Sequence, residues 1–253
     1  MDNIGATYVL VGNRDIDHLS QSIKLLRNFS PSIPVIVYLE SQKQIDLISK
    51  HLSNITFKLF ERLKYPTREE NRNSSTWRLK ALLESPFENT LYIDNDVYVV
   101  HKGFFEGFNI SENYGVSMVQ NPRMFISTYE QDIGDIDIGA DVQLHDKTFI
   151  KDMPKYMTSL NMGVIFYNKK SEPFIKEVLA QQLEYPSRGQ ASLARAIWKT
   201  KTQPYTLPIN WLVCKKHKGI ERPLALHVGH KNIYDWWKES FDKEPLIAQK
   251  GVI

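Results

Sequence analysis

Apolar and polar residues follow one another in a regular order of strand and helix patterns along the first hundred positions. Runs rich in β-branched and aromatic residues predict strands at 7–11, 34–39, 55–60 and 90–93. Apolar residues at helical spacing predict helices at 15–29, 41–52 and 76–85, the last preceded by a polar loop at 69–75. Ser41 and Gln44 have the spacing of a capping box. This alternating order predicts an α/β fold with a mostly parallel twisted sheet and helices on both faces.

The second half is less regular. Patterns predict strands at 114–120, 162–168 and 224–230, and helices at 172–183 and 189–198. A long polar insert at 121–155 carries six aspartates between Asp132 and Asp152, and such inserts are usually functional or disordered. Since there is no internal repeat and no linker, we expect a single domain over 1–253.

Composition excludes several classes of protein. The chain has 253 residues, of which 42% are hydrophobic and 24% charged, as in an ordinary soluble domain. Its one cysteine, Cys214, allows no internal disulfide, and the first residues do not have the pattern of a signal peptide, so we expect a cytoplasmic protein without a transmembrane segment. A net charge of +3 does not favour nucleic-acid binding.

Two aspartates follow directly after the apolar run at 90–93. Asp94 and Asp96 are separated by Asn95 alone, and two carboxylates this close repel each other. They can cap the next segment or face solvent in a turn. They can also hold Mg²⁺ or Mn²⁺, which prefer carboxylate oxygens, at the carboxyl end of a strand, where sheets of this kind bind ligands.

Two enzyme classes use such a pair. The residues at 94–97, DNDV, are similar to the nucleophile motif of haloacid-dehalogenase-like phosphatases, and 134–141 is similar to their later acidic motif. In that class, however, the pair ends the first strand, and here three strand patterns precede it. In nucleotide-sugar glycosyltransferases of the GT-A (Rossmann-like) fold, a D-x-D motif follows a βαβαβ unit, as it does here.

Five segments, in order, resemble retaining family 8 glycosyltransferases. They are the helix and metal strand at 74–100, LNMGVIFYN at 160–168, GQASL at 189–193, LPINW at 207–211 and HVGHKNIYDWW at 227–237. The chain departs from that family in two places: Gly189 stands where an aspartate is expected, and His227 and Lys231 are only four residues apart. A more distant GT-A group, including small viral or bacterial transferases, fits the same segments.

The resemblance implies a metal site and a diphosphate site. Asp94 and Asp96 would hold Mn²⁺ or Mg²⁺, with His227 as third ligand and His230 as its rival. Lys231 would stabilise the diphosphate. We therefore expect Asp94 and Asn95 to border the nucleotide.

Further contacts follow from the same resemblance. Arg78 would contact a phosphate or a sugar hydroxyl, whereas Lys80 faces elsewhere on its helix; a solvent-facing charge is the alternative for each. Thr7 and Tyr8 would hold the base, followed by Asn13 and Arg14, unless Tyr8 is simply a core residue.

The remaining predicted residues belong to the sugar and acceptor sites. Asn161 and Gly163 would contact the donor sugar, and Gln190 would stabilise the transition state of a retaining reaction, so Gln190, Asn161 and Asp96 are the expected catalytic residues. An inverting reaction would instead need a base, for which the insert offers aspartates. Trp236 and Trp237 are candidates for a sugar platform, a lid, a peripheral membrane contact or simple tail packing.

Together these features predict a metal-dependent glycosyltransferase, a hexosyl- or pentosyltransferase. It would move a sugar from a nucleotide-diphosphate donor, expected to be a UDP-sugar, to a glycan acceptor. The half at 1–100 would bind the nucleotide and the half at 101–253 the acceptor. The non-enzymatic alternative is a sugar-nucleotide- or carbohydrate-binding module that has kept the fold and lost the chemistry.

Overall fold

The computed structural model describes residues 3–65, 69–125, 158–184, 189–214, 220 and 222–229. The helices are α1 (Ile16–Phe29), α2 (Gln42–Ser49), α3 (Glu69–Leu83), α4 (Glu106–Tyr114), α7 (Glu172–Glu184) and α8 (Gly189–Thr200), with short 3-10 turns η1 (Lys102–Phe105), η2 (Lys169–Ser171) and η3 (Ile209–Trp211). The strands are β1 (Ile4–Val9), β2 (Val35–Leu39), β3 (Ile55–Leu59), β4 (Asn89–Ile93), β5 (Val97–Val99), β6 (Val116–Phe125), β7 (Thr158–Asn168), β8 (Tyr205–Leu207), β9 (Val213–Cys214) and β10 (Ala225–His227).

The central sheet has seven strands in the order β3-β2-β1-β4-β7-β6-β8. Strands β1 to β4 are parallel to one another, β7 is antiparallel to both of its neighbours, and β8 is parallel to β6. The predicted mostly parallel sheet is therefore confirmed, with β7 as the reversed strand in its middle.

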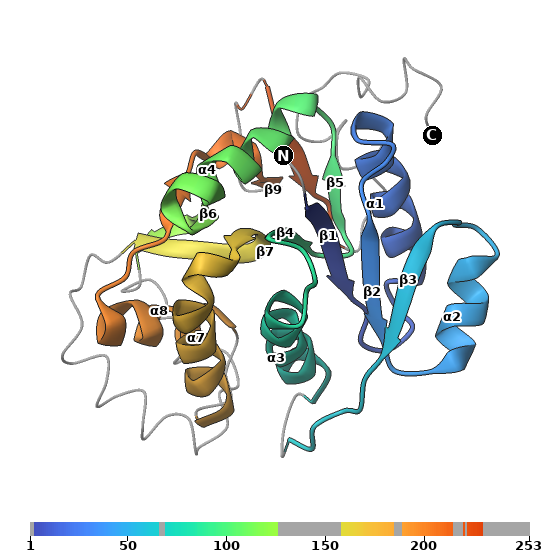
Figure 1. Ribbon diagram of the computed structural model, residues 1–253, viewed down its shortest axis with the longest axis horizontal. Coiled ribbons are helices and arrows are strands. Elements are labelled where there is room, and N and C mark those ends of the chain that lie inside the picture. Colours follow the sequence, from blue (N-terminus) through green and yellow to red (C-terminus); the bar gives the residue numbers. More distant parts are fainter. Residues whose placement is uncertain are drawn as a thin grey trace.

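Helices cover both faces of this sheet (Figure 1). On one face, α1, α2 and α4 pack on the alternate strand residues that include Ala6, Tyr8 and Phe166. On the other face, α3, α7 and α8 pack on the intervening residues, which include Tyr92 and Ile165. β4 is buried along its whole length, as expected for a central strand with helices on both sides.

A second, smaller sheet joins distant parts of the chain. Its order is β5-β10-β9, with β10 antiparallel to β5 and parallel to β9. The sequence did not predict β5 or α4, because both follow the aspartates where the apolar pattern becomes short and irregular. The predicted strand at 224–230 is real but is limited to Ala225–His227.

The predicted loop at 69–75 is wrong, because these residues form the first half of α3. Their polar composition hides the helix from a pattern of apolar spacing, yet Asn73 is completely buried. The Asn73 side chain accepts a hydrogen bond from the main-chain N–H of Leu63 at 2.8 Å and donates one to the Leu63 carbonyl at 2.9 Å. The first half of this helix is therefore fixed by tertiary hydrogen bonds that satisfy buried polar groups, whereas its second half packs on the sheet through apolar residues.

The capping box of α2 is confirmed. The Ser41 side chain accepts a hydrogen bond from the Gln44 main-chain N–H, and the Gln44 side chain accepts one from the Ser41 main-chain N–H. In contrast, Asp15 occupies the N-cap of α1 without a capping hydrogen bond from its side chain.

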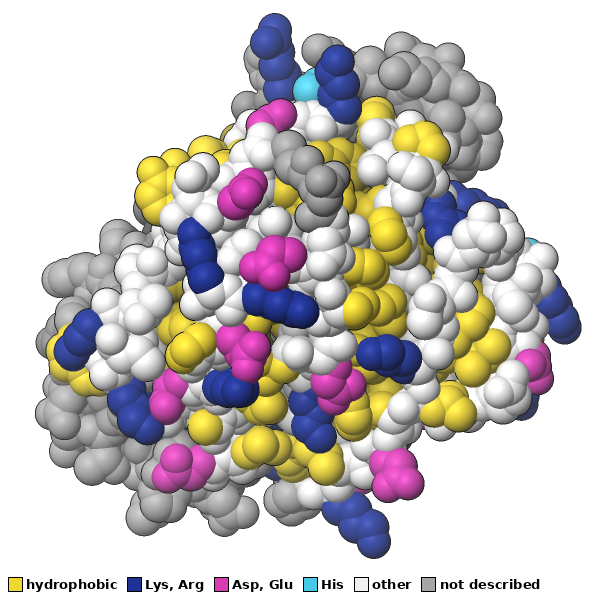
Figure 2. Space-filling model, viewed as in Figure 1, with side chains coloured by type: hydrophobic (Ala, Val, Ile, Leu, Met, Phe, Trp, Pro, Cys, Tyr) yellow, Lys and Arg dark blue, Asp and Glu magenta, His cyan; other side chains and the backbone are white. Residues whose placement is uncertain are grey.

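The outer surfaces of the helices are polar. Figure 2 shows acidic and basic side chains interspersed over one face of the molecule, with apolar side chains between them. Some charges on the helices are paired: Lys176 lies 2.6 Å from Glu172, and Lys199 lies 2.8 Å from Glu177. Among the described residues, no helix has both the length and the apolar composition that a membrane crossing requires.

Candidate metal and nucleotide site

Asp94 and Asp96 lie in the tight turn that joins the central sheet to the small sheet. β4 ends at Ile93, and the main-chain N–H of Asp94 then donates to the Gly163 carbonyl of the neighbouring strand at 2.8 Å. The turn closes with a hydrogen bond from the Val97 N–H to the Asp94 carbonyl at 3.1 Å. A rigid, buried strand therefore delivers both carboxylates to the carboxyl end of the parallel strands, where ligands bind in such sheets.

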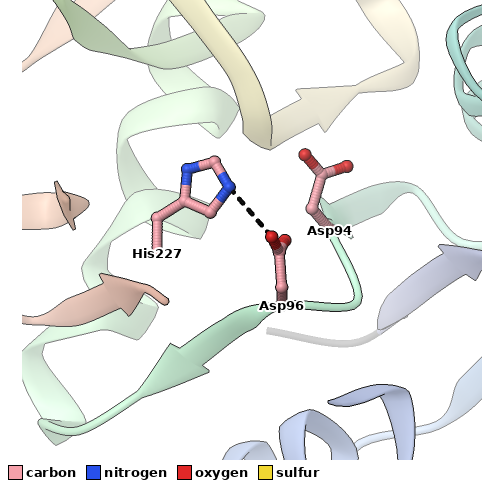
Figure 3. A group of neighbouring side chains, drawn as sticks. All are labelled: Asp94, Asp96 and His227. Atoms are coloured by element: carbon pink, nitrogen blue, oxygen red, sulfur yellow. Dashed lines mark ion pairs between the residues drawn. The ribbon is translucent and has the colours of Figure 1, made fainter. Parts of the chain in front are cut away.

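His227 reaches the same place from the far end of the chain. It ends β10, directly opposite Val97 of β5, and the next N–H, that of Val228, donates to the Asp96 carbonyl at 3.0 Å. The imidazole Nε2 of His227 lies 3.2 Å from Asp96 Oδ2 (Figure 3). One ligand atom from each of Asp94, Asp96 and His227 lies within 4.8 Å of the others.

Charge and burial act against each other at the Asp96–His227 pair. Burial opposes the ionised form of Asp96, but the hydrogen bond and the charge of His227 outweigh it and hold the pKa of Asp96 below its usual value. Burial likewise opposes the protonated imidazole, but Asp96 outweighs this effect and raises the pKa of His227. The pair thus keeps a negative carboxylate in a largely enclosed position, which is a suitable ligand for a divalent cation.

Asp94 is held by two side chains through one of its oxygens. Arg78 Nη2 donates to Asp94 Oδ1 at 2.8 Å, and the Tyr92 hydroxyl donates to the same oxygen at 2.7 Å. The Arg78 guanidinium lies 4.9 Å from the centre of the Tyr92 ring. Burial opposes the charge of Arg78, but attraction to Asp94 outweighs it and raises the pKa of Arg78. Arg78 is therefore a fixed positive charge beside the two carboxylates.

The second oxygen of Asp94 faces Gly163. A β-carbon at Gly163 would lie 2.9 Å from Asp94 Oδ2 and 3.0 Å from Asn161 Oδ1, which is closer than side chains tolerate. The Gly163 N–H donates to Asn161 Oδ1 at 2.7 Å. Glycine at this position thus leaves room beside β7 for the side chains of both Asp94 and Asn161.

The four predicted base-binding residues differ in burial: two lie in the core and two at the surface. Thr7 and Tyr8 are completely buried, and the Tyr8 hydroxyl lies 3.1 Å from Ser22 Oγ of α1. Burial raises the pKa of Tyr8 far above its usual value. Asn13 and Arg14, in the loop after β1, are exposed.

Gln190 is partly exposed near the start of α8, and Gly189 before it is buried. A β-carbon at Gly189 would lie 2.8 Å from Met162 Sδ, and its N–H donates to Ser75 Oγ at 3.2 Å. An aspartate, which the family 8 resemblance predicts at this position, would therefore require Met162 to move.

Two other predicted residues are placed by hydrogen bonds or ring contacts. Asn95 Nδ2 donates to the Val9 carbonyl at 3.0 Å, which ties the end of β1 to the turn of the two aspartates. Lys80 Nζ lies 4.3 Å from the centre of the Trp77 ring, on its own helix. Lys231, His230, Trp236, Trp237 and 126–155 of the acidic insert lie outside the described residues.

Sequence reasoning missed Tyr92 as a residue of this site. It lies two positions before Asp94, so the alternation of a strand places both side chains on the same face. That alternation was the available signal, but an aromatic residue in an apolar strand is usually a core residue.

Comparison with known proteins gives matches in structure only. No family model matches this sequence, and a search of the curated proteins found no match. Among solved structures, 376 chains match.

Three of these structures are of glycosyltransferases. The apo structure of the bifunctional glycosyltransferase WbbM has a TM-score of 0.62 and 13% identity, covering 98% of this chain and 51% of the WbbM chain. The galactosyltransferase LgtC in complex with donor and acceptor sugar analogs has a TM-score of 0.60 and 12% identity, covering 98% of this chain and 100% of LgtC. An active-site mutant of LgtC has a TM-score of 0.58 and 12% identity, covering 88% of this chain and 86% of that one.

These likenesses establish the fold, which is GT-A, the fold of LgtC. The chain spans about half the length of the WbbM chain. The pair of aspartates ends β4, the fourth strand along the chain, whereas the haloacid-dehalogenase-like alternative requires it at the end of the first. The fold therefore argues against that alternative.

Proposed function

We propose that this protein is a metal-dependent glycosyltransferase that moves a sugar from a nucleotide-diphosphate donor, a UDP-sugar, to a glycan acceptor with retention. The observation that carries this proposal is the meeting of Asp94, Asp96 and His227 at the carboxyl end of β4 in a GT-A fold. Two carboxylates and one imidazole fit Mn²⁺, which takes oxygen ligands and tolerates a nitrogen ligand. We expect the reaction in the cytoplasm, with oligomeric state left open.

The cation would be held by a carboxylate oxygen of Asp94, one of Asp96 and the imidazole of His227. When bound, it supplies Lewis-acid stabilisation of the negative charge on the departing nucleotide diphosphate. Arg78 keeps Asp94 in place through the other carboxylate oxygen. Its fixed positive charge beside the site would also favour the diphosphate. Lys231, outside the described residues, remains the second candidate cation for the diphosphate.

The nucleoside would lie over the loop after β1. Because Thr7 and Tyr8 are buried, Asn13 and Arg14 are the predicted base-binding residues whose side chains are open to a ligand. Asn95 would border the nucleotide from the turn of the two aspartates, since its Nδ2 is bonded to the Val9 carbonyl at the end of β1.

The donor sugar would lie against Asn161 and Gly163, where the missing side chain permits close approach. Gln190 would place its amide on the β-face of the donor sugar and stabilise the oxocarbenium-like transition state, while the acceptor attacks on the face from which the diphosphate departs. The active-site mutant of LgtC replaces a glutamine by glutamate, so the active site of LgtC also contains a glutamine. If the reaction inverts instead, a base from the acidic insert is needed.

Ligand-induced thermal stabilisation tests the donor class. A ligand that binds only the native state raises stability by about 2.7 kcal/mol at a hundredfold excess over Kd. We expect UDP with Mn²⁺ to raise the melting temperature, and either one alone to raise it much less. A shift with GDP and none with UDP, both in Mn²⁺, would refute the UDP assignment.

Turnover separates the enzyme from a binding module. Release of UDP from a UDP-sugar, with or without acceptor, is expected of a transferase because water can replace the acceptor slowly. Strong UDP binding without any release across several UDP-sugars would favour a binding module. Gln190→Ala should then be compared with the native protein: we expect UDP affinity to be kept while UDP release falls about tenfold or more, since the amide acts only in the transition state.

A further inference from the structure

Gly12 occupies the loop between β1 and α1 in a left-handed conformation, with a φ of 71°. Both polar groups of its main chain are held by side chains, one from the turn after β2 and one from the first turn of α2. The Gly12 N–H donates to Glu40 Oε2 at 2.9 Å, and its carbonyl accepts from Gln44 Nε2 at 2.7 Å. A loop residue fixed at both groups cannot rotate without breaking a hydrogen bond.

Glu40 is itself held by Arg62, which follows β3. Arg62 Nε donates to Glu40 Oε1, and Arg62 Nη2 donates to Glu40 Oε2 at 3.0 Å. The Glu40 side chain is only 15% exposed, and its hydrogen bond raises the pKa of Arg62. A bidentate pair of this kind fixes the orientation of a carboxylate as well as its position.

Gln44 is held equally firmly. It is 2% exposed, and its Oε1 accepts from the main-chain N–H groups of Glu40 at 2.7 Å and Ser41 at 3.1 Å. The same Gln44 side chain that completes the capping box of α2 therefore also holds the Gly12 carbonyl. On the other side of the loop, the Val9 carbonyl accepts from Asn95, in the turn of the two aspartates. The loop that presents Asn13 and Arg14 is thus attached to the turn of the two aspartates through Val9, and to Glu40 through Gly12.

We propose that Glu40 is a positioning residue for the donor nucleoside: it holds Gly12 so that Asn13 and Arg14 meet the base in one fixed arrangement, and Arg62 acts through Glu40. This inference rests on the proposed function, since it assumes a nucleotide over the loop. A loop ordered in advance binds more tightly because less conformational freedom is lost on binding. Glu40 contributes to affinity for the nucleoside and not to the metal or the diphosphate.

The experiment compares Glu40→Gln with the native protein, using Mn²⁺ alone, Mn²⁺ with pyrophosphate, and Mn²⁺ with UDP as probes in calorimetry. The Glu40 carboxylate accepts from Arg62 at both oxygens and from Gly12 at Oε2, and an amide has only one acceptor oxygen, so the bidentate pair with Arg62 is lost and the side chain no longer fixes Gly12 in one orientation. We expect the Kd for UDP to rise about tenfold, or 1.4 kcal/mol. The Kd values for Mn²⁺ and for pyrophosphate, which lacks a base, should stay within twofold.

Two further variants isolate the role of Glu40. Arg62→Gln, at a more exposed residue, should reproduce part of the loss for UDP, and the double variant should bind UDP no more weakly than Glu40→Gln alone. The matched control is Glu61→Gln, which makes the same chemical change at an exposed neighbour of Arg62. With UDP-sugars, KM should rise while kcat changes little.

The outcomes separate this inference from the proposed function. Absence of UDP binding by the native protein overturns both. If the native protein binds UDP, and Glu40→Gln and Arg62→Gln bind it as tightly as the control Glu61→Gln, the positioning role alone is overturned. Equal losses for UDP, pyrophosphate and Mn²⁺ overturn it too, because they would show general damage to the domain rather than an effect on the nucleoside.

Discussion

The two aspartates and the histidine of the candidate metal site are brought together in different ways. Asp94 and Asp96 are neighbours in the chain and follow a strand that is buried along its length in the middle of the seven-stranded sheet. His227 lies at the end of a three-residue strand in the small sheet, and it reaches Asp96 because β10 pairs with β5. One pair of ligands is therefore positioned by local chain geometry, and the third ligand by a long-range strand pairing.

This difference predicts how the positions of the three side chains should respond to destabilising substitutions in each sheet. The aspartates depend on β4, which few changes short of unfolding would disturb. His227 depends on the small sheet and on its apolar cluster of Leu25, Tyr98, Val213, Leu226 and Val228. We therefore expect the site to lose its histidine more easily than its carboxylates.

The largest effect is expected for Asp96→Ala. It removes a proposed metal ligand and the partner of His227, so Mn²⁺-dependent UDP binding and turnover should fall by more than about a hundredfold, or 2.7 kcal/mol. The fold should survive, because the residue lies in a turn outside the apolar core. Calorimetry with Mn²⁺ and UDP and a melting curve measure the two quantities. The control is Asp46→Ala, at an exposed position of α2. Undiminished activity of Asp96→Ala in Mn²⁺ would remove the metal site from the proposal.

A smaller loss is expected for His227→Ala. The two carboxylates remain, so Mn²⁺ should still bind, with a Kd raised about ten- to thirtyfold, or 1.4–2 kcal/mol. Titration with Mn²⁺ of the single variant His227→Ala, and of the double variant that also carries Asp96→Ala, measures this loss. If His227→Ala binds Mn²⁺ as tightly as the native protein, the third ligand lies elsewhere, with His230 as the first candidate.

Leu226→Ala tests the small sheet directly. Leu226 is completely buried, and shortening it should lower the free energy of unfolding by about 2–5 kcal/mol. Because β10 would be held less firmly opposite β5, we also expect a few-fold loss of Mn²⁺ affinity. The decisive measurement is the double variant with His227→Ala, which should bind Mn²⁺ no more weakly than His227→Ala alone. A further loss in the double variant would show that the small sheet also positions the aspartates.

Ser41→Ala is expected to have the smallest effect. It removes one half of the α2 capping box and should cost about 1 kcal/mol in the free energy of unfolding. Mn²⁺ affinity should be unchanged, because α2 does not contact the metal ligands. Denaturant unfolding measures the first effect and a Mn²⁺ titration the second. A change in Mn²⁺ affinity would mean that a substitution far from the three side chains also alters their positions.

Much of the structure of residues 1–100 followed from the sequence alone. Strands β1 to β4, the capping box of Ser41 and Gln44, and the position of the two aspartates at the end of β4 are all encoded in short stretches of chain. They could be predicted because each depends on contacts between near neighbours or on a periodic apolar face. His227 was also named, but from a resemblance between segments and not from any local pattern.

Tertiary structure alone decided the rest. It placed His227 beside Asp96 through β10 and β5, which are too short to give a pattern. It extended α3 through polar residues, because Asn73 found partners in the main chain of Leu63. It also buried Thr7 and Tyr8 and left Asn13 and Arg14 exposed, with Glu40 and Arg62 behind them. The physical reason is the same for His227, Asn73 and Tyr8: a buried polar group is stable only where another part of the chain supplies its partner, and a short stretch of sequence does not contain that partner.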